Sequence, residues 1–183
     1  MNPPDLSAAR DVTGFWRHAG PERWFAKNDA FDAEFGTRFL TLHEAAARGE
    51  LDHWAEEPEG ALALLVLLDQ FPRNTFRGQA RTFATDAKAL AIAHAAIEAG
   101  LDQKIDEELR RFFYLPFMHS ESLADQERSV ELNAALDANT QRFAVLHRDI
   151  IARFGRFPHR NKLLGRTSSA DEQRFLDEGG FAG

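Results

Sequence analysis

The chain has 183 residues, no cysteine and a formal net charge of -7 at pH 7, and 44% of its residues are hydrophobic. This composition is typical of a globular chain that forms one domain. The missing cysteines exclude disulfides, thiolate metal sites and cysteine nucleophiles, and they suit a reducing compartment. The acidic balance argues against a nucleic-acid partner, because nucleic-acid-binding surfaces are basic. We therefore expect a single cytoplasmic domain over residues 1–183.

The N-terminal sequence predicts neither a secretory signal nor a membrane segment. It lacks a basic start followed by an apolar stretch. The longest apolar run, Ala61–Leu68, is far shorter than the roughly 20 residues that a membrane-spanning helix needs. We expect no membrane partner.

The first part of the chain is predicted to form two amphipathic helices. Apolar residues recur at helical spacing over about residues 6–18 and 28–48. Asn28 is a plausible N-cap of the second helix, and Gly49 its C-terminal stop. Gly36 lies inside that helix and weakens it by about 1 kcal/mol relative to alanine. A neighbour packed closely against Gly36 would compensate for this cost.

The next helix is predicted to be the central buried one. It is expected to open at Pro58, and its sequence "ALALLVLLDQF" is apolar almost all round. We expect Phe71-Pro72 to end it, because proline disfavours α geometry in the residue before it. Thr85 is then expected to cap a further helix over about residues 86–99.

The second half of the chain is also predicted to be helical. The N-terminal signals there are Asp106, Ser122, Asn139 or Thr140, and Ser169 with Glu172 three residues on. Pro116 is expected to kink or stop the helix that starts at Asp106, and residues 178–183 are expected to form a loose tail. The expected fold is all-α, with seven to eight helices. No strict period of about 34 residues is visible, so we expect an irregular stack of antiparallel helix pairs.

Two segments share one pattern. Both "LLDQFPRNTFRG" (Leu67–Gly78) and "ARFGRFPHRNKLLGR" (Ala152–Arg166) place Phe-Pro, arginine and asparagine just after a predicted helix. A purely structural role is one interpretation: phenylalanine fills the core, proline ends the helix, and arginine donates to the last helix carbonyls. The other interpretation is a binding site, because the planar guanidinium binds a carboxylate or phosphate through two hydrogen bonds.

Positive charge is concentrated around the second segment. Residues 139–166 contain seven lysines or arginines and one acidic residue, Asp149, which can pair with Arg153 at i+4. The cations then left without a local partner are Arg156, Arg160, Lys162 and Arg166. Either acidic residues elsewhere pair with them, or the anion of a ligand does. The candidate acidic partners are Asp69, Glu121, Asp125 and Glu127.

Three further residues are candidates for acid–base chemistry: His119, Glu121 and His147. His147 falls on the apolar face of its helix, where a histidine is more often a hydrogen-bonded core residue. The sequences "HSE" and "HRD" place histidine and carboxylate two residues apart, which does not put both on one helical face. We expect no metal site, and no cofactor-binding motif is present.

Four segments together resemble one known family: "PERWFAKNDAFDAEF", "LLDQFPRNTFRG", "FFYLPFMHSESLADQERSV" and "HRDIIARFGRFPHRNKLLGR". The chain resembles the bacterial family catalogued as domain of unknown function 924 over almost its full length. This resemblance implies an all-helical fold related to the tetratricopeptide-like superfamily, without its regular consensus. It implies no activity and supplies no catalytic residues.

Two functions remain open at this point. The first is a site for a small anionic ligand, with or without catalysis, built from both Phe-Pro motifs and lined by Asp69, Arg73, Asn74, Arg156, His159, Arg160 and Asn161. The second is a helical-repeat module that binds a protein partner, with the polar motifs serving as internal scaffolding.

Overall fold

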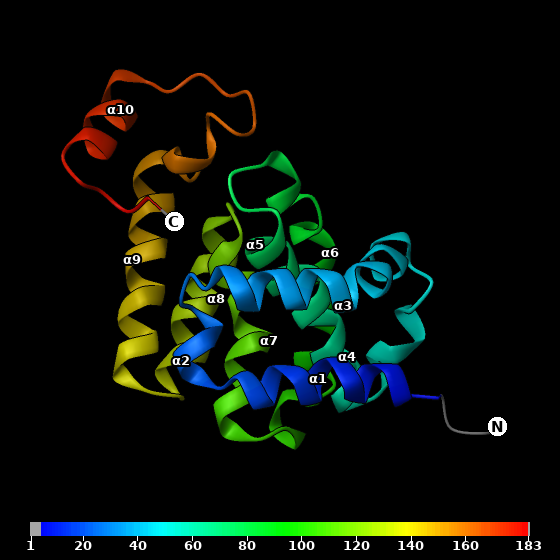
Figure 1. Cartoon of the computed structure of the whole chain (residues 1–183). Coiled ribbons are helices and arrows are strands. Elements are labelled where there is room, and N and C mark those ends of the chain that lie inside the picture. Colours follow the sequence, from blue (N-terminus) through cyan, green and yellow to red (C-terminus); the bar gives the residue numbers. More distant parts are fainter. Residues whose placement is uncertain (1–4, 183) are drawn as a thin grey trace. The chain divides into compact units, whose positions relative to one another are not determined.

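The computed structural model describes residues 5–182, and these residues form an all-α structure with no strand (Figure 1). The described residues contain eight α-helices of eight or more residues: α1 (Ser7–Ala19), α3 (Asp29–Arg48), α4 (Pro58–Leu65), α6 (Asp86–Glu98), α7 (Glu107–His119), α8 (Leu123–Ala134), α9 (Ala138–Phe154) and α10 (Ala170–Asp177). Two shorter helices are α2 (Pro21–Trp24) and α5 (Phe71–Thr75). The predicted fold class and helix number are confirmed. None of the described helices is long and apolar enough to cross a membrane.

The described residues divide into two compact units. The first contains residues 5–77 and 81–116, and the second contains residues 78–80 and 117–182. We describe each unit by itself. The expectation of one domain, the stacking of helix pairs and the loose tail over residues 178–183 stay predictions, and Gly183 lies outside the described residues.

Aromatic rings fill the core of the first unit. Phe15 on α1 stacks on Phe31 and Phe35 of α3, with ring centroids 5.3 and 5.4 Å apart. Trp16 is fully buried and lies 5.3 Å from the ring of Phe35. Offset or edge-to-face aromatic pairs at such distances add to the free energy gained by burying apolar area. The predicted N-cap of α3 is present, since the side chain of Asn28 accepts a hydrogen bond from the backbone of Phe31.

The central helix is buried as expected, but Pro72 does not end it. A turn of π-helix, Val66–Gln70, carries the chain from α4 directly into α5. In this turn the N–H of Phe71 donates to the carbonyl of Val66, one residue further back than in an α-helix. The widened turn lets Pro72 enter α5 near its start, where a missing N–H costs little. The prediction of a break at Phe71-Pro72 is therefore wrong.

The π-turn leaves carbonyl groups without their ordinary helical donors. Leu68 would accept from residue 72, which has no N–H because it is proline, and Leu67 would accept from Phe71, which donates to Val66 instead. Side chains supply the missing hydrogen bonds, as described next.

Two residues from other helices donate to these buried carbonyls. Nδ1 of His43, on α3, donates to the Leu67 carbonyl at 2.8 Å, and the hydroxyl of Thr85 donates to the Leu68 carbonyl. Thr85 was expected to cap α6, and it does precede that helix, but its side chain makes no cap hydrogen bond. Burial lowers the pKa of His43 and outweighs the hydrogen bond to Leu67, which by itself would raise it.

The second unit contains α8, α9 and α10, and α8 and α9 run side by side (Figure 1). Asp137 caps α9 by accepting from the backbone of Asn139 and Thr140, so this helix begins before the predicted start. The predicted capping box at the start of α10, formed by Ser169 and Glu172, is confirmed. Pro116 lies inside α7 and does not stop it.

His43→Phe should destabilise the chain by about 1–3 kcal/mol, because it leaves the buried Leu67 carbonyl without a donor. Denaturant unfolding of the variant and the wild type measures this difference. His53→Phe is the matched control, since His53 is exposed and should leave stability within about 0.5 kcal/mol of the wild type. Equal unfolding midpoints for His43→Phe and the control would contradict this account of the π-turn.

Candidate functional site

The arginine of the first Phe-Pro motif is engaged within the protein. Arg73 donates to both carboxylate oxygens of Asp86, at 2.9 and 3.0 Å, and lies 3.1 Å from a carboxylate oxygen of Asp69. It also donates to the backbone carbonyl of Asp69, at the end of the π-turn. Asp69 is 1% exposed. Arg73 therefore makes its two parallel hydrogen bonds to Asp86 and not to a ligand.

A second group of polar side chains lies beside this motif. Asn74 donates to one carboxylate oxygen of Asp32 at 2.7 Å, and Nε of Arg77 donates to the other at 3.1 Å. The side chain of Arg77 is 41% exposed, and its two terminal nitrogens have no hydrogen-bond partner within residues 5–182. Those nitrogens form one edge of a planar fork, which matches a carboxylate or phosphate.

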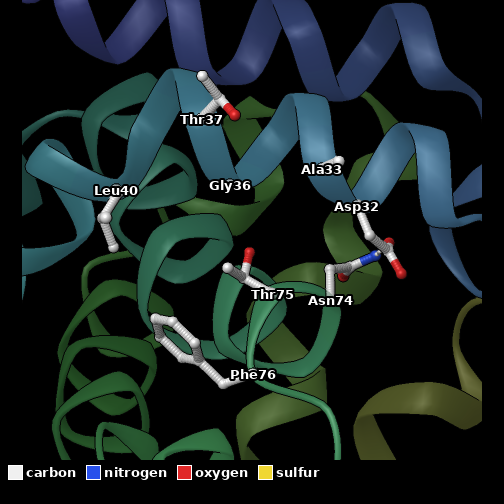
Figure 2. A pocket seen from close by; sticks show the side chains of 8 residues that line it. All are labelled: Asp32, Ala33, Gly36, Thr37, Leu40, Asn74, Thr75 and Phe76. Carbon is white, nitrogen blue, oxygen red and sulfur yellow. Dashed lines mark hydrogen bonds between the residues drawn. The ribbon is translucent and has the colours of Figure 1, made fainter.

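Asp32 and Asn74 border a pocket of about 420 Å³ between α3 and α5 (Figure 2). It is lined by Asp32, Ala33, Gly36, Thr37, Leu40, Asn74, Thr75 and Phe76. Gly36 faces Thr75, and a Cβ atom at Gly36 would lie 3.1 Å from Cγ2 of Thr75. The compensating neighbour expected at Gly36 is therefore Thr75, and glycine allows the two helices to approach closely.

Two of the four cations around the second Phe-Pro motif, Arg156 and Arg166, pair with carboxylates of the second unit. Arg156 binds both oxygens of Glu172, at 2.6 and 2.8 Å. These hydrogen bonds and one from the backbone of Ser169 lower the pKa of Glu172 to about 2. Arg166 binds both oxygens of Glu121, at 2.6 and 2.9 Å. Glu121 was among the predicted partners of these cations, whereas Glu172 was not.

Glu121 also organises the backbone of this motif. It accepts a hydrogen bond from the N–H of Phe157 at 2.8 Å. Burial opposes its ionisation, but the donors on Arg166 and Phe157 outweigh burial and hold the pKa of Glu121 below its usual value. The predicted pair of Asp149 with Arg153 is wrong: Asp149 pairs with Arg148, and the guanidinium of Arg153 lies over the ring of Phe154.

Two histidines of the second unit, His147 and His159, lie among aromatic rings. His147 donates from Nδ1 to the Phe143 carbonyl, and its ring lies 4.6 Å from that of Phe181. His159 also contacts Phe181, at 5.3 Å. Burial, together with the positive charge of Arg160, lowers the pKa of His159 to about 4. This ring is therefore neutral at pH 7 and packs as part of an aromatic cluster.

The structure divides the predicted site residues into two groups. Asp69, Arg73 and Asn74 come together in the first unit. The second unit holds His119, Glu121, His147, Arg156, His159, Arg160 and Asn161. Arg160 and Asn161 are buried, and Arg160 lies over the ring of Phe157. No cluster of histidine or carboxylate groups placed to hold a metal occurs within residues 5–182.

Sequence reasoning missed the pocket beside the first motif. Thr75, Phe76 and Arg77 stand inside the quoted "LLDQFPRNTFRG" segment, but only Arg73 and Asn74 of α5 were selected from it, with Asp69 of the π-turn. Asp32 stands in the "PERWFAKNDAFDAEF" segment, and no local pattern joins it to a residue 42 positions away. The signal that could have found the pocket is Gly36, which marks a close approach of two helices.

Comparisons with known proteins identify relatives of unknown function. The sequence profile of a family described as "Bacterial protein of unknown function (DUF924)" matches residues 12–180. A solved structure described as a protein of unknown function, ATU0120, from Agrobacterium tumefaciens is 52% identical, with a TM-score of 0.93. The alignment covers 96% of this chain and 100% of that one. No curated protein matches the chain.

Arg166→Ala should lower the free energy of unfolding by about 1.5–3 kcal/mol, because the half-buried Glu121 loses two charge-assisted hydrogen bonds. Arg128→Ala is the control: its pair with Glu131 is exposed, so the loss should be at most about 1 kcal/mol. Chemical denaturation at pH 7 measures both variants. If Arg166→Ala is no more destabilising than Arg128→Ala, the second motif is not held by this ion pair.

Acid should destabilise the chain through His159 before the carboxylates titrate. Its pKa is about 4 in the folded chain and 6.5 as a model value, so the unfolded chain binds a proton first as the pH falls. This contribution is complete above about pH 6.5 and declines below it, by about 2 kcal/mol between pH 7 and 4.5. The His159→Gln variant should lose less stability than the wild type over this range. It should still lose some, because burial also lowers the pKa of His43. If the free energy of unfolding of His159→Gln falls with pH in parallel with that of the wild type, His159 is not the source of this pH dependence.

Proposed function

The chain belongs to the bacterial DUF924 family, and because that family is described as of unknown function, we propose a function from the geometry alone: the pocket between α3 and α5 binds a small molecule that carries a carboxylate or phosphate. The observation that carries this proposal is Arg77: its Nε donates to Asp32, which lines the pocket, and its two terminal nitrogens have no hydrogen-bond partner within the described residues.

The size and lining of the pocket support this proposal. Its volume of about 420 Å³ falls within the roughly 300–1,000 Å³ that small-molecule sites occupy. Asn74 and Asp32 supply polar groups at fixed positions, because each is held by hydrogen bonds to the other or to Arg77. Fixed polar groups in a mainly apolar hollow are typical of sites that orient a ligand.

The second Phe-Pro motif supports a different role. Arg156 and Arg166 use their two-point geometry on Glu172 and Glu121, so they act as scaffolding that attaches α10 and the segment after α9. This is the internal role that the alternative function, a protein-interaction module, assigned to the motifs. Catalysis by His119, Glu121 or His147 and a cytoplasmic location remain proposals, and we assign no reaction.

Two tryptophan substitutions on α3 test the proposed pocket. Ala33 and Ala30 are both exposed alanines on this helix, but only Ala33 lines the pocket. Ala33→Trp should therefore abolish binding of inorganic phosphate and small carboxylates, whereas Ala30→Trp should bind them as the wild type does. Arg77→Gln should weaken binding by about 1.5–3 kcal/mol, the usual contribution of hydrogen bonds to a charged group. NMR titrations that follow the amide signals of residues 33–40 measure all four proteins.

The proposal fails if no probe shifts these signals in the wild type. It also fails if Ala33→Trp and Ala30→Trp bind the probes equally well. Either result would favour the interaction-module alternative, in which both Phe-Pro motifs are scaffolding.

A further inference from the structure

The two ends of the α3–α5 pocket differ in chemistry. One end carries Asp32 and Asn74, and the other carries Leu40 and Phe76 (Figure 2). Arg77 is not itself a lining residue, but its Nε donates to Asp32. The polar end carries the carboxylate of Asp32 and the amide of Asn74, and the donors nearest to it belong to Arg77, whereas Leu40 and Phe76 at the other end have apolar side chains. A ligand that satisfies both ends must itself be amphipathic.

The apolar end is accessible and suits an uncharged group. Leu40 is 38% exposed, so its side chain is accessible from the solvent. The guanidinium of Arg81 lies over the ring of Phe76 at 4.0 Å, but its charge is paired with Glu44 at 3.0 Å. This end therefore favours an apolar chain over a second anionic group.

The wall between the two ends is formed by small side chains. Asp32 and Leu40 are eight residues apart on α3, which is about 12 Å at 1.5 Å per residue. Ala33, Gly36 and Thr37 line the pocket between them, and none of them carries a large side chain. The missing side chain of Gly36 is replaced by close packing against Thr75, so the backbone of α3 itself borders the pocket at this point. An extended chain fits along this wall more easily than a bulky ring.

We propose that the pocket selects a small amphipathic anion, with its anionic head on the terminal nitrogens of Arg77 and an unbranched apolar chain of several carbons along Gly36 toward Leu40 and Phe76. This inference rests on the proposed function and specifies its ligand class. A free inorganic anion would use only the polar end, and the apolar end would add nothing to its affinity.

A series of straight-chain carboxylates tests the inference. Butyrate, hexanoate and octanoate share one head and differ only in chain length, so the affinity of the wild type should rise with each methylene that enters the pocket. We expect about a two- to fourfold gain per methylene, the upper value being that of a fully buried group. NMR titration of the wild-type chain with each acid gives the three dissociation constants.

Two variants separate the ends of the pocket. Leu40→Asn should flatten the dependence on chain length while butyrate binds almost as in the wild type. Arg77→Gln should weaken all three acids by a similar factor, at least about tenfold, and leave the gain per methylene unchanged. Leu123→Asn is the matched control, because Leu123 is an equally exposed leucine in the second unit and should change neither quantity.

The outcomes distinguish this inference from the function on which it rests. If butyrate and inorganic phosphate bind at residues 33–40 but the affinity does not rise with chain length, the amphipathic ligand class is wrong and the anion site stands. If the gain per methylene is the same in Leu40→Asn as in the wild type, the chain does not reach Leu40, and the inference is overturned. If no probe binds, the proposed function fails with it.

Discussion

The absence of an N–H on Pro72 is the constraint around which the first unit is arranged. A proline at this point would ordinarily break the central helix, and the chain avoids the break with one π-helical turn, Val66–Gln70. That turn leaves two buried carbonyls that need donors, and His43 and Thr85 provide them. The central helix is thereby tied to α3 and to the start of α6 by hydrogen bonds as well as by apolar contact.

Continuity of this helix also positions the candidate site. Because α5 begins directly after the π-turn, Asn74 and Thr75 face α3, where Asn74 bonds to Asp32 and Thr75 lies against Gly36. A break at Pro72 would remove the geometric reason for this contact. The pocket is thus a consequence of how the chain passes a proline, and Gly36 is the residue on α3 that permits the close approach.

The two Phe-Pro motifs have similar sequences but different surroundings. In the first, Arg73 is fixed by Asp69 and Asp86, and Arg77, four residues later, is an exposed side chain that bonds to Asp32 through Nε alone. In the second, Arg156 binds Glu172 on α10, and Arg166 binds Glu121 in the segment before α8. A shared pattern of residue types therefore does not determine whether an arginine meets a ligand or a carboxylate of the same chain, because the partners come from distant positions.

Sequence reasoning predicts those features of the fold that local signals determine. The apolar run of the central helix, the Asn28 cap and the capping box at Ser169 all depend on residues within a few positions of one another. The π-turn could not be predicted, because its stability comes from donors on α3 and before α6. The pocket was missed for the same reason: Asp32 and Asn74 are 42 residues apart and meet only in the folded chain.

The most direct test of the central claim is a crystal structure of the chain grown with hexanoate. The account predicts electron density for a carboxylate on the terminal nitrogens of Arg77, with the carbon chain extending past Gly36 toward Leu40. Hexanoate bound instead at the second motif, near Arg156 or Arg160, would contradict the account. A pocket left without hexanoate at concentrations that saturate the titration would contradict it as well.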